Sequence, residues 1–99
     1  MLNIDKSFEN GAASFALEGR LDTMTAPTLE KELKDGLNGL SKLTLDFEKL
    51  EYISSAGLRV LLAAQKQMNG QGEMKLVHVN ETIMEIFEVT GFSDILTIE

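Results

Sequence analysis

The spacing of apolar residues along the chain predicts strands that alternate with helices. Apolar and polar residues alternate in residues 2–8 and again in residues 13–17. Asn10-Gly11 lies between these runs and is a strong hairpin signal, because both residues tolerate the positive φ of a tight turn. We therefore expect the chain to begin with a β-hairpin.

The rest of the chain repeats a strand-and-helix pattern. A helix is predicted by the helical spacing of Leu29, Leu33, Leu37 and Leu40. Residues 23–27 form its expected start, with a threonine cap and Pro27 in the first turn. Further strands are expected over residues 43–47, 74–79 and 95–98, and further helices over residues 55–68 and 80–91. Strand-helix-strand crossovers favour an α/β fold, with a mixed β-sheet of about five strands, an opening antiparallel hairpin and three or more α-helices. Ninety-nine residues fit a single domain spanning residues 1–99.

Two serines lie where a strand pattern becomes a helix pattern. The apolar period changes from two to about 3.6 across residues 52–57, which contain Ser54 and Ser55. A helix N-terminus leaves amide N–H groups unpaired and carries partial positive charge. This junction is therefore a favourable place for an added phosphate.

Composition excludes several classes of function. The chain has no cysteine, which removes disulfides, thiolate catalysis and cysteine-ligated zinc. A net charge of −7 argues against nucleic acid and anionic membranes as direct partners, because both favour clustered lysine and arginine. There is no leader pattern and no apolar run near the roughly 20 residues of a spanning helix. We expect a cytoplasmic protein that binds a protein partner through a basic docking surface of that partner.

Three sequence motifs resemble those of one protein family. The stretch Leu-Asp-Phe-Glu-Lys-Leu-Glu-Tyr-Ile-Ser-Ser-Ala-Gly-Leu-Arg-Val-Leu-Leu, residues 45–62, resembles the signature of the STAS domain of bacterial anti-sigma factor antagonists. Gly19-Arg20-Leu21-Asp22 is similar to that family's Gly-x-Leu-Asp segment, and Thr90-Gly91-Phe92 is similar to its turn after the third helix. The resemblance covers essentially the whole chain. Many family members continue into a further C-terminal helix, for which this sequence shows no pattern.

The resemblance implies a partner-switching protein. Such an antagonist, when unphosphorylated, binds an anti-sigma factor that is also a serine kinase with a GHKL-type ATPase fold, and a sigma factor is released. Phosphorylation by the kinase ends the binding, and a metal-dependent serine phosphatase of the PP2C type restores it. We expect the chain itself to be no enzyme, and to use no cofactor and no metal.

The resemblance also assigns the modified residue. The family signature reads Asp-Ser-Ser/Thr-Gly-Leu, and its first serine accepts the phosphate. Aligning Gly57-Leu58 places Ser55 at the acceptor, Ala56 at the next position and Ser54 at the preceding Asp. Serine in place of Asp removes a charge but keeps an oxygen that can cap the helix. This departure leaves open whether a kinase recognises Ser55, and whether Ser54 could itself be modified, although Ser55 is favoured.

Without the resemblance, the spacing of the two serines is explained by helix capping alone. If Ser55 is phosphorylated, the carboxylates of Asp22, Asp46 or Glu48 would add like-charge repulsion against a partner. The residues that we expect to contact the partner are Asp22, Thr23, Ser54, Ser55, Ala56, Gly57 and Arg59.

Several of these residues have a second interpretation. Asp22 could cap its own turn, and Gly57 could serve packing rather than the close approach of a partner. Arg59 is typical of a solvated helix residue, but it could also touch the partner or neutralise a phosphate at Ser55. Asp46 is expected to point outward from its strand into solvent. His78, the only histidine, is expected in an apolar strand with a structural role rather than one in catalysis or metal binding.

Two other functions remain open. A hydrolase with Ser54 or Ser55 as nucleophile would need a base and oxyanion donors, but the chain has one histidine on a predicted core strand and no Gly-x-Ser-x-Gly motif. A STAS-type scaffold would bind another partner constitutively, without a phosphorylation cycle. No glycine-rich phosphate loop supports a nucleotide site.

Overall fold

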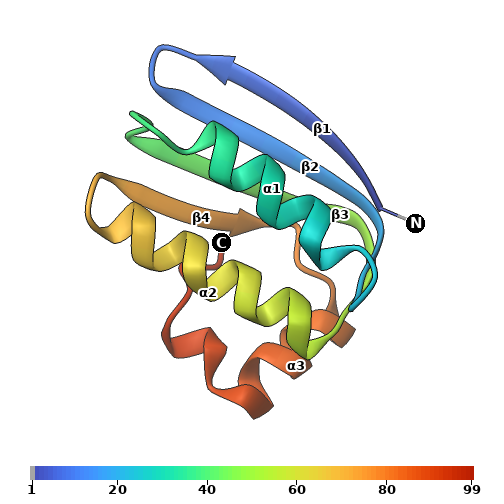
Figure 1. Cartoon of the computed structure of the whole chain (residues 1–99). Helices are drawn as coiled ribbons and strands as arrows, with labels where there is room; N and C mark the ends of the chain where they lie inside the picture. Colours follow the sequence, from blue (N-terminus) through green and yellow to red (C-terminus); the bar gives the residue numbers. More distant parts are fainter. Residues whose placement is uncertain (1) are drawn as a thin grey trace.

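The computed structural model describes residues 2–99 as a four-stranded sheet packed by three helices (Figure 1). The elements in order are β1 (Leu2–Glu9), β2 (Ala12–Leu21), α1 (Ala26–Gly36), β3 (Lys42–Ile53), α2 (Ser55–Asn69), β4 (Glu73–Val77), α3 (Glu81–Thr90) and a short 3₁₀ helix η1 (Phe92–Asp94). The strands lie in the order β1-β2-β3-β4. β1 and β2 are antiparallel, whereas β2, β3 and β4 are parallel. The predicted mixed α/β fold is therefore confirmed.

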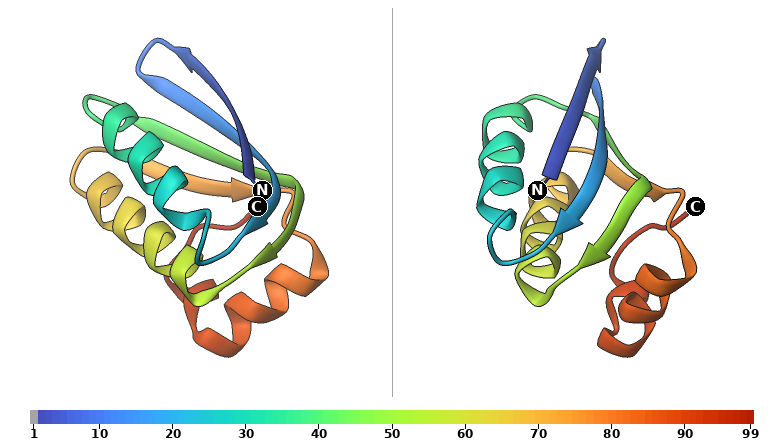
Figure 2. Two further views of the ribbon diagram at one scale, coloured as in Figure 1. Left: turned by 45° about the vertical axis from the view of Figure 1, so that its right-hand side comes forward. Right: turned by 90° about the vertical axis from the view of Figure 1, so that its right-hand side faces the viewer.

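The helices are divided between the two sides of the sheet. α1 and α2 run side by side over one face, and α3 lies on the other side (Figure 2). Alternate residues of β2 and β3 are fully buried beneath α1 and α2, among them Phe15 and Leu45. Phe47 packs against Phe87 of α3 with ring centroids 6.3 Å apart. The predicted hairpin turn is present, with φ of 47° at Asn10 and 80° at Gly11.

The expected last strand is only a single bridge. Phe92–Asp94 forms a 3₁₀ turn, so only the final residues of the chain reach the free edge of β4. There Leu76 N–H donates to Thr97 O at 2.9 Å, and Glu99 N–H donates to Leu76 O at 2.9 Å. The sheet of residues 2–99 consequently has four strands rather than about five.

Two local predictions are wrong. Thr25 occupies the N-cap position of α1, but its hydroxyl donates to Arg20 O at 2.7 Å instead of capping the helix amides. β4 ends at Val77, and His78 follows it with a φ of 58° and an exposed side chain. His78 is thus outside the strand and outside the core, because its left-handed backbone departs from the extended conformation of β4.

None of the helices formed by residues 2–99 combines the length and the apolar character that crossing a lipid bilayer requires.

Candidate functional site

The residues expected to form the site meet at one end of the sheet, where β2 and β3 both finish. Leu21 and Ile53 are partners in the parallel ladder, and Ser54 N–H donates to Leu21 O at 2.9 Å. The segment after β2 therefore lies beside the segment after β3. This is the edge at which parallel α/β sheets commonly place their functional residues.

Ser54 caps α2, as the sequence indicates. Its backbone is extended, with φ −101° and ψ 176°, and its Oγ accepts from Gly57 N–H at 3.4 Å. Its carbonyl oxygen accepts from Leu58 N–H at 3.0 Å, which closes the first helical turn. The half-buried Ser54 hydroxyl is therefore engaged with the helix.

Ser55 is the more accessible of the two serines. It is the first residue of α2, its side chain is exposed, and its hydroxyl makes no hydrogen bond within residues 2–99. The amide N–H groups of the first helical turn lie beside it and favour negative charge. Ser55 is consequently positioned where a phosphate would be tolerated by the fold.

Gly57 holds the start of α2 against the sheet. A Cβ added at this buried residue would lie 2.7 Å from Leu21 Cγ and 2.8 Å from Ile53 Cγ1. Only glycine permits this close approach of the helix to the ends of β2 and β3. The structure therefore gives Gly57 a packing role, which fixes the place of Ser55.

Asp22 organises the loop between β2 and α1. Its Oδ1 accepts from Met24 N–H at 3.0 Å and from Thr25 N–H at 3.1 Å. Partial desolvation raises the pKa of Asp22, but the hydrogen bonds from Thr25 and Met24 outweigh it and leave the pKa below its usual value. Asp22 thus caps its own turn, which was the second interpretation of this residue, while its carboxylate stays at the site.

Met24 is a feature that the sequence did not reveal. It lies in the loop shaped by Asp22, and 85% of its surface is exposed. A hollow next to this loop, between the first turns of α1 and α2, is lined by Thr23, Ala26, Pro27, Glu30, Ala56, Arg59 and Val60. Methionine is enriched in protein–protein interfaces, so Met24 beside this hollow is a candidate contact for a protein partner.

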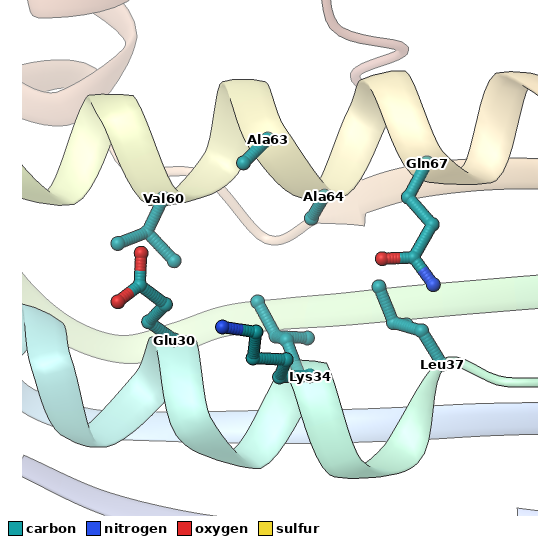
Figure 3. Close-up of a pocket in the computed structure, with 8 residues that line it drawn as sticks. Glu30, Lys34, Leu37, Val60, Ala63, Ala64 and Gln67 are labelled. Atoms are coloured by element: carbon teal, nitrogen blue, oxygen red, sulfur yellow. The ribbon is translucent and has the colours of Figure 1, made fainter.

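A second hollow continues along the same helix pair. Figure 3 shows its lining from α1 (Glu30 and Lys34), from Leu37 just after α1, and from α2 (Val60, Ala63, Ala64 and Gln67). The two hollows share Glu30 and Val60. Together they mark the seam between α1 and α2, with Ser55 and Met24 near one end.

Asp46 and His78 form a contact away from this site. His78 Nδ1 lies 2.9 Å from Asp46 Oδ1 and 4.0 Å from Glu48 Oε2. The hydrogen bond and the charge of Asp46 raise the pKa of His78. Partial burial raises the pKa of Asp46, but the hydrogen bonds from Glu48 N–H and His78 outweigh it and lower the pKa overall.

This cluster bears on the predictions made for Asp46, Glu48 and His78. Asp46 points out of the sheet but is paired rather than only solvated. The donor atoms of Asp46, Glu48 and His78 lie within 4.8 Å of one another, a spacing that could hold a metal ion, and His78 Nδ1 already has a hydrogen-bond partner in Asp46 Oδ1. Asp46 is seven residues before the end of β3, roughly 20 Å along the strand from Ser54. His78 is therefore too far from the serines to act as their base, and Asp46 and Glu48 lie outside the immediate surroundings of the Ser55 hydroxyl.

Comparisons with known proteins agree with this geometry. Residues 3–99 match the model of the STAS domain family. BtrV of Bordetella bronchiseptica, whose name describes a candidate anti-sigma factor antagonist, is 37% identical over 99 residues, covering 98% of this chain and 84% of BtrV. The anti-sigma-B factor antagonist of Bacillus subtilis is 26% identical over 98 residues, covering 98% of this chain and 90% of that protein.

A solved structure shows the same fold. The Bacillus cell fate determinant SpoIIAA in its phosphorylated form aligns with a TM-score of 0.76 at 15% identity, covering 98% of this chain and 91% of SpoIIAA. The family match and the relatives named as anti-sigma factor antagonists lead to one conclusion: the chain belongs to the STAS domain family.

Proposed function

We propose that this protein is an anti-sigma factor antagonist that binds an anti-sigma factor at the end of the sheet where Ser55 lies. The observation that carries the proposal is the exposed Ser55 hydroxyl at the first turn of α2, on the same molecular end as the exposed Met24 and the adjoining hollow. Met24 supplies an apolar anchor, and Thr23, Ala56 and Arg59 supply the border of the contact. The names of the relatives support an anti-sigma factor as the partner.

Phosphorylation of Ser55 would switch this binding off. The kinase activity of the partner, a GHKL-type ATPase, transfers the γ-phosphoryl group of ATP to Ser55 Oγ and releases ADP, while the hydroxyl proton passes to a base on the kinase. A PP2C-type phosphatase returns Ser55 to the hydroxyl form by hydrolysis. That SpoIIAA was solved in a phosphorylated form is consistent with such a cycle in this fold.

The fold itself should survive the modification, because the phosphate lies at a helix N-terminus. The partner, in contrast, would meet about −1.5 to −2 additional charges and the bulk of the phosphate in the contact. Asp22, in the adjacent loop, adds a charge of the same sign. A loss of a few kcal/mol in binding free energy corresponds to a decrease in affinity of about a hundredfold or more.

The proposal is tested by calorimetric titration of the cognate anti-sigma factor with wild type, Ser55→Ala and Ser55→Asp. We expect Ser55→Ala to bind and Ser55→Asp to bind at least about a hundredfold more weakly, while circular dichroism shows that both are folded. Equal binding by all three variants would contradict the switch. Loss of folding in Ser55→Asp would contradict the argument that the charge acts on the partner.

Constitutive binding as a STAS scaffold is the second candidate. The observation that favours it is Ser54, a neutral capping residue where the family signature has Asp. The two candidates are separated by the intact mass of the protein after incubation with ATP and the kinase, with Ser55→Ala as the control. An increase of one phosphate in wild type alone supports the switch, and no increase supports the scaffold.

A further inference from the structure

Arg59 lies one helical turn after Ser55. Residues four positions apart in an α-helix have Cβ atoms about 5–6 Å apart on the same face. Helical side chains also lean toward the N-terminus, so the side chain of Arg59 covers the turn that begins at Ser55. Both residues are exposed. An anion on Ser55 would therefore be within reach of the Arg59 guanidinium.

Arg59 is also uncommitted in the structure. It takes part in none of the ion pairs formed by residues 2–99. The other arginine is engaged, because the Arg20 guanidinium lies 4.6 Å from the centroid of the Tyr52 ring and its Nε lies 3.9 Å from Asp22 Oδ2. Without phosphate, Arg59 instead borders the hollow between α1 and α2.

We propose that Arg59 is the residue that holds the phosphate of phosphorylated Ser55, and that this pairing withdraws the arginine from the border of the hollow. The inference rests on the proposed modification of Ser55 and adds a second effect to it. Phosphorylation then places a dianion on the partner-binding surface and removes the cation that lines its hollow. Arginine suits this role because its planar guanidinium can donate two parallel hydrogen bonds to phosphate oxygens.

Other charged groups near Ser55 also favour or oppose the negative charge of the phosphate. Asp22 in the loop after β2 opposes the negative charge, as does Glu30 of α1, which lines the hollow opposite Arg59. Near the end of β3, the strand that leads to Ser55, the ionisable side chains are those of Glu51 and Tyr52. The amide N–H groups of the first turn of α2 favour the charge. Arg59, one turn after Ser55, is the cationic side chain that α2 contributes near its N-terminus.

The test uses the full chain with phosphoserine inserted at position 55 during translation, so that no kinase is needed. The phosphate is titrated by ³¹P NMR through its second ionisation, near pH 6. We expect the midpoint in wild type to lie about 0.3 pH units below that of Arg59→Gln, and the difference to shrink in high salt. Lys66→Gln, which removes a cation at the far end of the same helix, should leave the midpoint close to wild type.

A second measurement follows Arg59 itself. The Nε–H resonance of Arg59 should shift between the unmodified chain and the chain carrying phosphoserine, and circular dichroism should show that all variants are folded. Equal midpoints for Arg59→Gln and Lys66→Gln, or an unmoved Arg59 resonance, would overturn the inference. Since the phosphate is installed without the kinase, a failure of the natural kinase to modify Ser55 would instead count against the proposed function alone.

Discussion

Replacing Gly57 by alanine should weaken the fold at the point where Ser55 is presented. The added Cβ would lie 2.7 Å from Leu21 Cγ and 2.8 Å from Ile53 Cγ1. Non-bonded carbon atoms do not approach this closely without repulsion. Neither atom is the free end of a flexible side chain, and both residues are at most 1% exposed. The helix or its neighbours must therefore shift.

The magnitude follows from two opposing effects. Overpacking of a buried site costs about 1–3 kcal/mol. Alanine favours a helix over glycine by up to about 1 kcal/mol. We expect Gly57→Ala to lower the free energy of unfolding by about 1–2 kcal/mol, which lowers Tm by about 4–16 °C for a domain of this size.

Urea denaturation followed by circular dichroism measures this difference. Gly70→Ala is the matched control, because Gly70 follows the same helix and its added Cβ would meet only Gln67 O, at 3.5 Å. We expect the control to stay within about 0.5 kcal/mol of wild type. If Gly57→Ala were as stable as Gly70→Ala, the packing argument for the start of α2 would be wrong.

Two further predictions concern the His78 contact and Met24. The contact raises the pKa of His78, so its contribution to stability is fully present below pH 6.5 and is lost as the pH rises through the raised pKa. The contact lowers the pKa of Asp46, so that contribution is fully present above pH 3.8 and is lost as the pH falls through the lowered pKa. The excess stability of wild type over His78→Asn should thus be largest between these values and shrink on either side, as measured by urea denaturation across pH; a constant difference would contradict this. Met24→Ser should leave Tm unchanged, because the side chain is 85% exposed, but should weaken binding of the anti-sigma factor about tenfold or more in calorimetry. Unchanged affinity would remove Met24 from the contact.

Local signals in the sequence were sufficient for most elements. Asn10-Gly11 predicts the hairpin because its turn geometry depends on those two residues alone. The change of apolar period predicts the β3–α2 junction, and Asn80 caps α3 as expected, accepting from Ile83 N–H at 2.9 Å. The resemblance to the STAS signature then identified the family.

Features that depend on distant parts of the chain could not be predicted. The contact of Asp46 with His78 spans 32 residues and exists because β3 and β4 pair with Asp46 opposite Val77. The left-handed backbone of His78 has no sequence signal of the kind that a glycine gives. The exposure of Met24 depends on the turn that Asp22 builds from its own hydrogen bonds. Each requires the tertiary arrangement.

The direct passage from β3 to α2 leaves Ser55 almost no backbone freedom. One extended residue separates the last strand residue from the helix, and that residue is hydrogen bonded to β2 and to α2. A protein that recognises Ser55 therefore meets a preorganised target and loses little conformational entropy in ordering it. If Ser55 is phosphorylated as proposed, we expect the main chain that carries it to keep its shape, so that a partner would distinguish the two forms through the side chain.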